Sequence, residues 1–299
     1  MELSLRSYAK INLSLDITGI LPDGYHGVET VMQAVSLYDT VNLSFTEGGD
    51  DFAVKLSNNR GLPNDERNLA YKAAILMQKR SGKKGVLAID IEKKIPIAAG
   101  LAGGSSNAAA VIVGLNSLFR MNLKVRELCS IAEELGSDIP FLVLVTGTKY
   151  KTALGYNKGE KLEPIKSRFR SHILLVKPPF GVSTKEVYQG MDEIKDYAHP
   201  SKDALIDCLI KGDRRKAFSY MGNVLENYTL KAYIEVGKVK EYLKGTEGAD
   251  FVLMSGSGPT VIGFYDSYEL CRKNALLLRE KGYEAYYVET LSYGKKGDM

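Results

Sequence analysis

The segment from Pro96 to Asn107 constrains this chain more than any other part of it, and it reads Pro-Ile-Ala-Ala-Gly-Leu-Ala-Gly-Gly-Ser-Ser-Asn. Its glycines allow the backbone to turn with positive φ or to approach a ligand closely, and they are Gly100, Gly103 and Gly104. An apolar, helix-forming run follows from Ala108 to Leu118, and the polar residues just before it offer capping side chains: Ser105, Ser106 and Asn107. Such a loop directs free N–H groups and the positive end of a helix dipole to one point, which predicts a phosphate site.

The spacing of these glycines excludes two common phosphate motifs. No Gly-x-x-x-x-Gly-Lys-Ser/Thr occurs, so the loop is not of the P-loop type, and no lysine follows the glycines. Nor is it Gly-x-Gly-x-x-Gly, which argues against a dinucleotide fold or a protein-kinase glycine loop. The simpler alternative is a glycine-rich turn before a buried helix, but ordering such a glycine-rich stretch costs conformational entropy.

Length and composition indicate an ordinary globular protein with room for two domains. The chain has 299 residues, 44% hydrophobic and 25% charged, with a net charge of +4. Its three cysteines lie far apart and its histidines lack metal-ligand spacing, which favours reduced thiols and no zinc site. No apolar run approaches the roughly 20 residues of a membrane span, and the N-terminus lacks a signal-peptide core. We therefore expect a cytoplasmic protein without nucleic-acid or membrane partners, and an anionic small substrate fits its charge.

The order of predicted elements indicates an α+β protein with two domains, 1–160 and 161–299. In the first, strands over 3–17, 28–37, 41–45, 52–56 and 86–91 surround a helix over 68–80, and helices over 108–118 and 125–135 precede an apolar strand over 141–145. Pro140 breaks the pattern, so we expect Asp138 to lie on a loop with an extended backbone. In the second domain, the order of strand, helices, two strands, helix and strand predicts a ferredoxin-like module with inserted helices.

Several motifs resemble those of the GHMP kinase superfamily of small-molecule kinases, in the right order along nearly the whole chain. Three are shared by the superfamily: Ala9–Leu13, Pro96–Asn107 and the turn Ser255–Thr260. Two others, Asp23–His26 and Gly136–Phe141, resemble members whose alcohol substrate carries a cytidine diphosphate. The resemblance implies an N-terminal ATP-binding lobe like domain 2 of ribosomal protein S5 and a C-terminal ferredoxin-like lobe. It also implies transfer of the γ-phosphoryl group of ATP, with Mg²⁺, to a hydroxyl group.

Lys10 and Asp138 are the catalytic residues that this resemblance implies, with Asp138 as the base. Lys10 lies in a strand between apolar neighbours, where an unpaired ammonium is costly to bury, so a carboxylate or phosphate partner is expected. A Lys10–Asp138 pair would hold the aspartate ionised and direct the lysine towards the transferred phosphoryl group. Asn12 shares the face of Lys10, because strand side chains repeat every second position. The alternatives are a turn aspartate and an edge-strand lysine that reaches water.

The resemblance places the ATP phosphates on the backbone amides of the glycine loop and the adenine or ribose near Asn68. The expected ATP-binding residues are Asn68, Pro96, Ile97, Ala98, Ala99, Gly100, Leu101, Ala102, Gly103, Gly104, Ser105, Ser106 and Asn107. The Ser105 or Ser106 hydroxyl would reach Mg²⁺. No acidic metal ligand is evident, so the sequence leaves the protein ligands of Mg²⁺ open, and we expect the phosphates to supply most of its ligands. Ala99 and Ala102 replace the usual glycines of the family, so negative φ is expected at both.

The substrate side of the predicted site is aromatic. The resemblance implies that Tyr25 stacks on cytosine, that His26 binds the edge of the base and that Tyr188 covers its opposite face. The Ser255–Thr260 turn would approach the diphosphate through its N–H groups. The expected substrate-binding residues are Asn12, Tyr25, His26, Tyr188, Gly256, Ser257, Gly258 and Thr260. The alternatives are a buried helix residue for Tyr188 and a plain hairpin for the turn.

Two other functions compete with this one. One is a different GHMP enzyme, such as a homoserine or mevalonate-type kinase, against which the Tyr25–His26 pair argues because those substrates carry no base. The other is a non-catalytic nucleotide- or RNA-binding module, suggested by the positive charge, against which the presence of both Lys10 and Asp138 argues. We expect a monomer or a weak homodimer.

Overall fold

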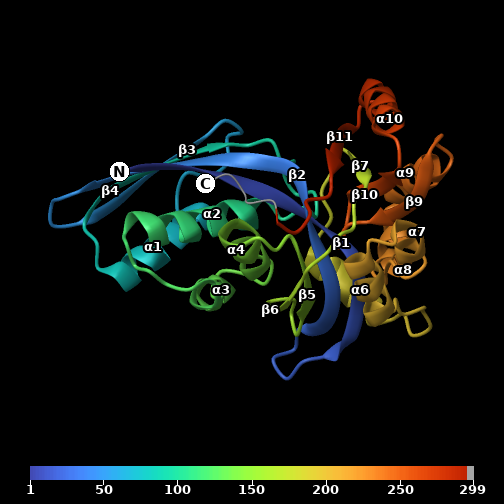
Figure 1. Cartoon of the computed structure of the whole chain (residues 1–299), viewed down its shortest axis with the longest axis horizontal. Helices are drawn as coiled ribbons and strands as arrows, with labels where there is room; N and C mark the ends of the chain where they lie inside the picture. The colour runs from blue at the N-terminus through green and yellow to red at the C-terminus, as the bar shows by residue number, and fades with distance from the viewer. Residues whose placement is uncertain (295–299) are drawn as a thin grey trace.

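Two β-sheets organise the chain, as a computed structural model that describes residues 1–294 shows (Figure 1). The first sheet has the order β3-β4-β2-β1-β8, and β5 extends it by pairing with β2 and β6. Its strands are β1 (Glu2–Ile20), β2 (His26–Glu47), β3 (Phe52–Asn58), β4 (Gly85–Glu92), β5 (Thr152–Tyr156), β6 (Lys161–Ile165) and β8 (Gly222–Asn223). Most neighbours are antiparallel, while the β3–β4 and β1–β8 pairs are parallel. Among the described residues, no helix is long and apolar enough to cross a bilayer.

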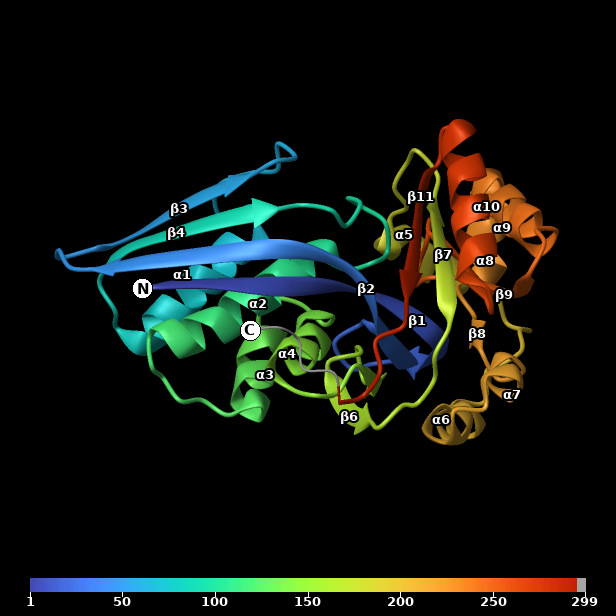
Figure 2. The same ribbon diagram turned by 45° about the horizontal axis from the view of Figure 1, so that its top comes forward.

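Four helices cover one face of this sheet (Figures 1 and 2). They are α1 (Leu69–Ser81), α2 (Gly103–Leu118), α3 (Val125–Glu133) and α4 (Ile139–Gly147). Helix α2 packs between the sheet and its neighbours, and its residues from Ala108 to Leu115 are buried on every side. Helix α1 begins where expected, because the Asn68 side chain accepts a hydrogen bond from the Ala70 N–H, and it ends at Gly82 in the left-handed conformation.

The second sheet has the order β11-β7-β10-β9, in which every pair is antiparallel. Its strands are β7 (His172–Lys177), β9 (Ala249–Met254), β10 (Val261–Tyr265) and β11 (Glu284–Glu289). The accompanying helices are α5 (Thr184–Met191), α6 (Lys202–Lys211), α7 (Arg214–Phe218), α8 (Glu226–Ala232), α9 (Ile234–Lys244) and α10 (Tyr268–Glu280). Helices α9 and α10 pack on one face of the sheet. The strand and helix order is that of a ferredoxin-like module with added helices, as expected.

The long strands β1 and β2 connect the two halves. Leu5 of β1 belongs to the core under α2, whereas Ile11 and Leu13 belong to a second core shared with the β7–β10 sheet and α6. The chain also returns to the first sheet at its end, where Thr290 bridges Val35. Lys10 therefore lies where one strand passes from the first core to the second.

Some expected elements were wrong. Residues 141–145 are not a strand but part of α4, since a wholly apolar run fits any fully buried element and α4 is buried on all sides. The strands expected over 28–37 and 41–45 form one strand, β2. Strands β5 and β6 and helix α8 were not anticipated. The division at residues 160 and 161 stays a prediction, with β6 just beyond it hydrogen-bonded to β5.

Candidate active site

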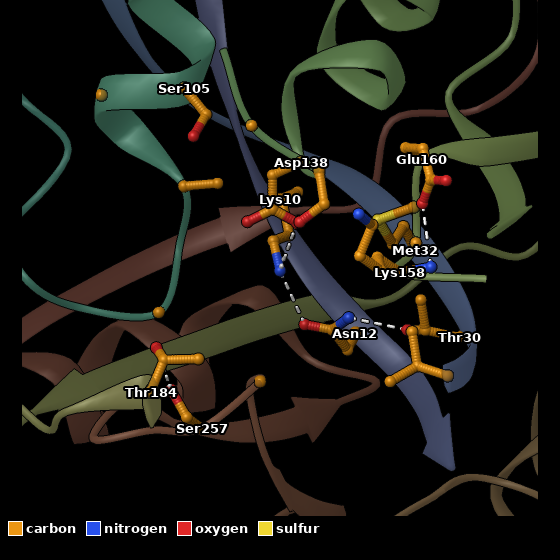
Figure 3. A pocket seen from close by; sticks show the side chains of 18 of the residues that line it. Lys10, Asn12, Thr30, Met32, Ser105, Asp138, Lys158, Glu160, Thr184 and Ser257 are labelled. Atoms are coloured by element: carbon orange, nitrogen blue, oxygen red, sulfur yellow. Dashed lines mark hydrogen bonds and ion pairs between the residues drawn. The ribbon is translucent and has the colours of Figure 1, made fainter. Parts of the chain in front are cut away.

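A cavity of about 1550 Å³ opens between the glycine loop, the β1–β2 turn, α5 and the Ser255–Thr260 turn. Both halves of the chain contribute to its wall. It brings together many of the predicted site residues, among them Lys10, Asn12, Tyr25, His26, Pro96, Ile97, Ala98, Ala99, Gly100, Ala102, Gly103, Gly104, Ser105, Asp138, Tyr188, Gly256 and Ser257. Figure 3 shows how Lys10, Asn12 and Asp138 approach one another in this cavity.

Lys10 of β1 forms the ion pair with Asp138 that the family resemblance implies. Its Nζ lies 3.3 Å from Asp138 Oδ1 and donates a 3.0 Å hydrogen bond to Asn12 Oδ1. Asn12 Nδ2 donates in turn to Thr30 Oγ1 at 2.7 Å, which fixes the orientation of the amide. The lysine side chain is only 7% exposed, whereas the Asp138 side chain is 40% exposed and open to the cavity. A buried, doubly anchored ammonium thus faces an accessible carboxylate.

Asp138 does not lie on an extended loop, so that expectation was wrong. It is the N-cap residue of α4, with φ −77° and ψ −20°. Pro140 occupies the first turn of this helix, where the missing N–H has no intrahelical partner to lose. The Asp138 side chain makes no capping hydrogen bond. Its carboxylate is therefore available to a ligand in the cavity. It also lies at the positive end of the α4 dipole.

The glycine loop leads directly into α2, which begins at Gly103 rather than after Asn107. Ala102, the N-cap residue, has φ +55°, so the expected negative φ there was wrong; Ala98 also lies in the left-handed region, at φ +51°, whereas Ala99 does not. With no capping side chain at Ala102, the first amides of α2 stay available to a ligand.

The three polar residues near the start of α2, Ser105, Ser106 and Asn107, differ in direction and do not cap the helix. Ser105 lines the cavity. Ser106 is buried and its hydroxyl donates to the Tyr8 carbonyl at 2.7 Å, and Asn107 is buried under the loop. Leu101 is also buried, while its carbonyl accepts the Lys10 N–H at 3.1 Å. Of the two candidate hydroxyls for Mg²⁺, only that of Ser105 faces the cavity.

The Ser255–Thr260 turn packs against the glycine loop. A Cβ atom at Gly100 would lie 2.8 Å from the Gly258 carbonyl oxygen and 2.9 Å from that of Ser255, so only glycine allows this approach. Gly256 and Ser257 line the cavity, and Ser257 Oγ is 2.9 Å from Thr184 Oγ1 of α5. Thr260 is fully buried and, like Gly258, does not line it.

The aromatic end of the cavity combines residues from distant segments. The His26 and Tyr188 rings lie 5.1 Å apart at an interplanar angle of 39°, and His26 Nε2 is 2.7 Å from Asp192 Oδ1. Burial, together with the nearby Asp138 charge, raises the pKa of Tyr188 above its usual value. Tyr25 is 64% exposed and lies under the Lys158 ammonium, at 5.0 Å from the ring centroid. The exposed Tyr25 ring and the His26 imidazole therefore both line this end of the cavity.

Several residues of the cavity wall were missed from the sequence. Lys158 pairs with Asp23 at 3.0 Å, and this hydrogen bond lowers the pKa of the aspartate and raises that of the lysine. Glu160 is nearly buried and accepts the Lys158 N–H at 2.9 Å. These residues, with Thr184, lie in turns and helix starts where no local motif marks them. Asn68, in contrast, acts as the α1 cap, and Leu69 beside it reaches the cavity.

The side chains of the cavity suit a metal ion that binds together with a polyphosphate. They suit less well a metal ion that the protein holds by itself. Within residues 1–294, no group of three or more His, Cys, Asp or Glu side chains is arranged to hold a metal ion. At the glycine loop, the cavity offers the Ser105 hydroxyl as a ligand for the metal and the backbone amides as donors to the phosphates. Mg²⁺ favours one or two protein ligands with substrate phosphates and water, which suits this donor set.

Comparison with known proteins places the chain among small-molecule kinases. Residues 68–145 match the family described as GHMP kinases N terminal domain. The 4-diphosphocytidyl-2-C-methyl-D-erythritol kinase of Geobacillus thermodenitrificans is 45% identical over 266 residues, 89% of each chain. That of Bacillus pumilus is 46% identical over 263 residues, 88% of each chain.

Solved structures share the same architecture. A crystal structure of 4-(cytidine 5'-diphospho)-2C-methyl-D-erythritol kinase superimposes with a TM-score of 0.79 at 28% identity, covering 97% of this chain and 100% of that one. The L. major mevalonate kinase, in complex with R-mevalonate, gives a TM-score of 0.71 at 18% identity, covering 97% and 96%. The second likeness concerns the fold alone. Together these matches confirm the α+β, two-lobed fold expected from the sequence.

Proposed function

Because the chain belongs to the GHMP kinase family, as one of its 4-diphosphocytidyl-2-C-methyl-D-erythritol kinases, we propose that it transfers the γ-phosphoryl group of ATP to the 2-hydroxyl group of that substrate. The reaction belongs to the non-mevalonate route to isoprenoid precursors. The observation that carries the assignment of residues is the Lys10–Asp138 pair, 3.3 Å apart, in the one cavity that the glycine loop and the Tyr25–His26 pair also line.

In this proposal Asp138 is the base. Its exposed carboxylate takes the proton of the substrate hydroxyl as that oxygen bonds to the γ-phosphorus, while the bond from this phosphorus to the β,γ-bridging oxygen breaks and ADP leaves. The proton then passes from Asp138 to water. The Lys10 ammonium, buried and held by Asn12, compensates negative charge that develops on the transferred group.

The glycine loop binds the ATP phosphates in the same proposal. The free amides at the start of α2 and the helix dipole attract the triphosphate, and Ser105 supplies the protein hydroxyl for Mg²⁺. The Ser105 hydroxyl and the phosphates would hold Mg²⁺, which, when bound, would supply neutralisation of the phosphate charge. Ser106 and Asn107 contribute through the shape of the loop, because their side chains point into the protein.

The aromatic end selects the cytidine group. Tyr25 offers an exposed ring for stacking, worth about 1–3 kcal/mol per base. His26 and Tyr188 lie side by side, which supports an arrangement in which the base meets both rings. Gly256 and Ser257, beside Lys10 and Asn12, are placed to meet the diphosphate or the erythritol unit.

The deciding experiment is a coupled ADP-release assay with three acceptors. We expect turnover with the cytidyl substrate, a large loss of kcat/KM with the same alcohol lacking cytidine, and no turnover with mevalonate. Preference for mevalonate would overturn the substrate assignment. We also propose, from the sequence, a cytoplasmic enzyme that acts as a monomer or weak homodimer without nucleic-acid or membrane partners; sedimentation analysis tests the oligomeric state.

A further inference from the structure

A buried polar network lies beneath the glycine loop and takes no part in the chemistry above. Its centre is Asp39, in the middle of β2, whose side chain is fully buried. Asp39 Oδ2 pairs with Lys93 Nζ and accepts a 2.9 Å hydrogen bond from Asn107 Nδ2. Asp39 Oδ1 accepts the N–H groups of Lys94 and Ile95, at 2.7 and 2.8 Å. Both carboxylate oxygens therefore have two partners each.

These partners lie at the two ends of one loop. Lys94 and Ile95 immediately precede Pro96, where the loop begins, while Asn107 lies in α2, just after the loop ends. Lys93 Nζ closes the network by donating to Asn107 Oδ1 at 3.0 Å. One carboxylate thus joins the entrance and the exit of the loop, and holds them at a fixed separation on β2.

The same network also supports the first turn of α2, which follows the loop. A Cβ atom at Gly103 would lie 2.9 Å from Ile95 Cγ2 and 3.1 Å from Lys93 Nζ, so the first turn of α2 rests directly on these two side chains. Lys93 also reaches the wall of the cavity. The ion pair of Asp39 and Lys93 is neutral as a unit, so it supports the loop without cancelling the positive potential of the amides above it.

We propose that Asp39 is a positioning residue for ATP: by joining both ends of the glycine loop, it holds the phosphate-binding amides in place before the nucleotide arrives. The inference rests on the proposed role of the loop in ATP binding. Orienting such amides in advance removes their reorganisation from the binding step, and a misplacement of about 1 Å costs about 100-fold in rate.

Asp39→Asn is the sharpest test, because an amide cannot replace this carboxylate. If its oxygen keeps the Lys94 and Ile95 N–H groups, its NH2 group faces two other donors, Lys93 Nζ and Asn107 Nδ2; if it flips, the backbone contacts are lost. We expect KM for ATP to rise about 10- to 100-fold, with KM for the alcohol substrate within about twofold of wild type. A merely destabilised enzyme would instead lose active fraction, and both KM values would stay unchanged.

Two further variants keep the test decisive. Asn107→Ala removes the exit contact and leaves the buried Asp39–Lys93 pair intact, so KM for ATP should rise less, about three- to tenfold, even if Asp39→Asn fails to fold. Glu284→Gln, which breaks a Lys177–Glu284 pair in the second sheet, is the matched control and should leave KM for ATP unchanged. An unchanged KM for ATP in folded Asp39→Asn, or in Asn107→Ala, overturns the proposal.

Binding of a non-hydrolysable ATP analogue, measured by titration calorimetry without any acceptor, separates this proposal from the assignment of the substrate. Weaker binding by Asp39→Asn than by wild type supports the role of Asp39 even if the cytidyl alcohol is not phosphorylated. Equal binding by the two proteins overturns it even if the alcohol is phosphorylated.

Discussion

The two ends of the cavity are built in different ways. At the phosphate end, the wall is main chain at the start of α2, supported by the fully buried Asp39 and by Asn107. At the aromatic end, the wall is side chains: the exposed Tyr25 held under Lys158, and His26 beside Asp192 and Tyr188. The first is supported by one sheet and its helices, apart from the contact of Gly100 with the Ser255–Thr260 turn, whereas the second joins the β1–β2 turn to α5 of the other half.

The phosphate end serves phosphoryl transfer, which every kinase of this family performs. The aromatic end serves recognition of one particular substrate. Buried networks with all partners satisfied specify a single geometry, which suits a step that depends on placing a phosphoryl group. Ion pairs and ring contacts between exposed side chains are weak and can rearrange around a ligand. This suits a site that must recognise one ligand among many. Substitutions at the phosphate end should therefore change the chemistry or ATP binding, and those at the aromatic end only the affinity for the cytidyl group.

The largest effect is expected for Asp138→Asn, which lies between the two ends. Removal of a general base lowers kcat by about 100- to 10,000-fold, and α4 loses no capping hydrogen bond because the Asp138 side chain makes none. Single-turnover ADP release measures the step. The control is Glu133→Gln, another carboxylate of the cavity wall, paired with Lys161, with kcat within about twofold of wild type. A loss below tenfold for Asp138→Asn would remove the base from the mechanism.

The pH dependence of stability tests how α4 is held, the helix that begins at Asp138 between the two ends of the cavity. Lys151 donates to the Val145 and Thr148 carbonyls at the end of α4, the helix that begins at Asp138, and burial lowers its pKa to about 8. The pKa of this lysine in the unfolded chain is about 10.4. Between about pH 8 and this value, the unfolded state therefore binds more protons than the folded state. Unfolding free energy should therefore rise with pH from about 8 to 10, by up to about 1.4 kcal/mol per unit.

The variant Lys151→Met isolates the contribution of this lysine to the pH dependence of the unfolding free energy. The variant should lack the rise between pH 8 and 10, whereas Lys149→Met, at an exposed neighbour, should keep the wild-type slope. Chemical denaturation at several pH values gives the slopes. Equal slopes for wild type and Lys151→Met would show that the buried ammonium is not a source of the pH dependence.

Tyr25→Leu tests the aromatic end alone. Loss of one stacking ring should raise KM for the cytidyl substrate about 5- to 150-fold, equivalent to about 1–3 kcal/mol, with KM for ATP unchanged. Tyr25→Phe keeps the ring and should stay close to wild type. Should Tyr25→Leu alter KM for ATP as strongly as KM for the alcohol, the two ends would not be independent.

The smallest effect is expected for Lys158→Met, which removes the cation above Tyr25 and the partner of Asp23. An exposed cation–π contact contributes about 0.5–1 kcal/mol, so KM for the cytidyl substrate should rise only about two- to fivefold. High salt should shrink the difference from wild type, because exposed charges are screened. A rise above 20-fold would indicate that Lys158 binds the substrate directly.

The sequence predicted those features that depend on neighbours along the chain. Alternation along β1 placed Lys10 and Asn12 on one face, the pattern over 68–80 predicted α1, and the order of strands and helices in the second half indicated its ferredoxin-like sheet. The resemblance supplied the partner of Lys10, which spacing alone did not identify. The apolar run after Asp138 was wrongly predicted to be a strand. It is a helix that is buried on all sides, and such burial removes the periodicity that distinguishes a helix from a strand.

The sequence by itself thus determined a glycine loop before a helix, a polar strand face and an α+β order of elements, since each is set by local backbone and side-chain preference. The tertiary structure alone decided the positive φ of Ala102, the place of Asp138 at the start of α4, the contact of His26 with Tyr188 and the burial of Asp39 under the loop. These depend on packing between segments far apart in the chain, where contacts with distant residues outweigh the local preference of each residue.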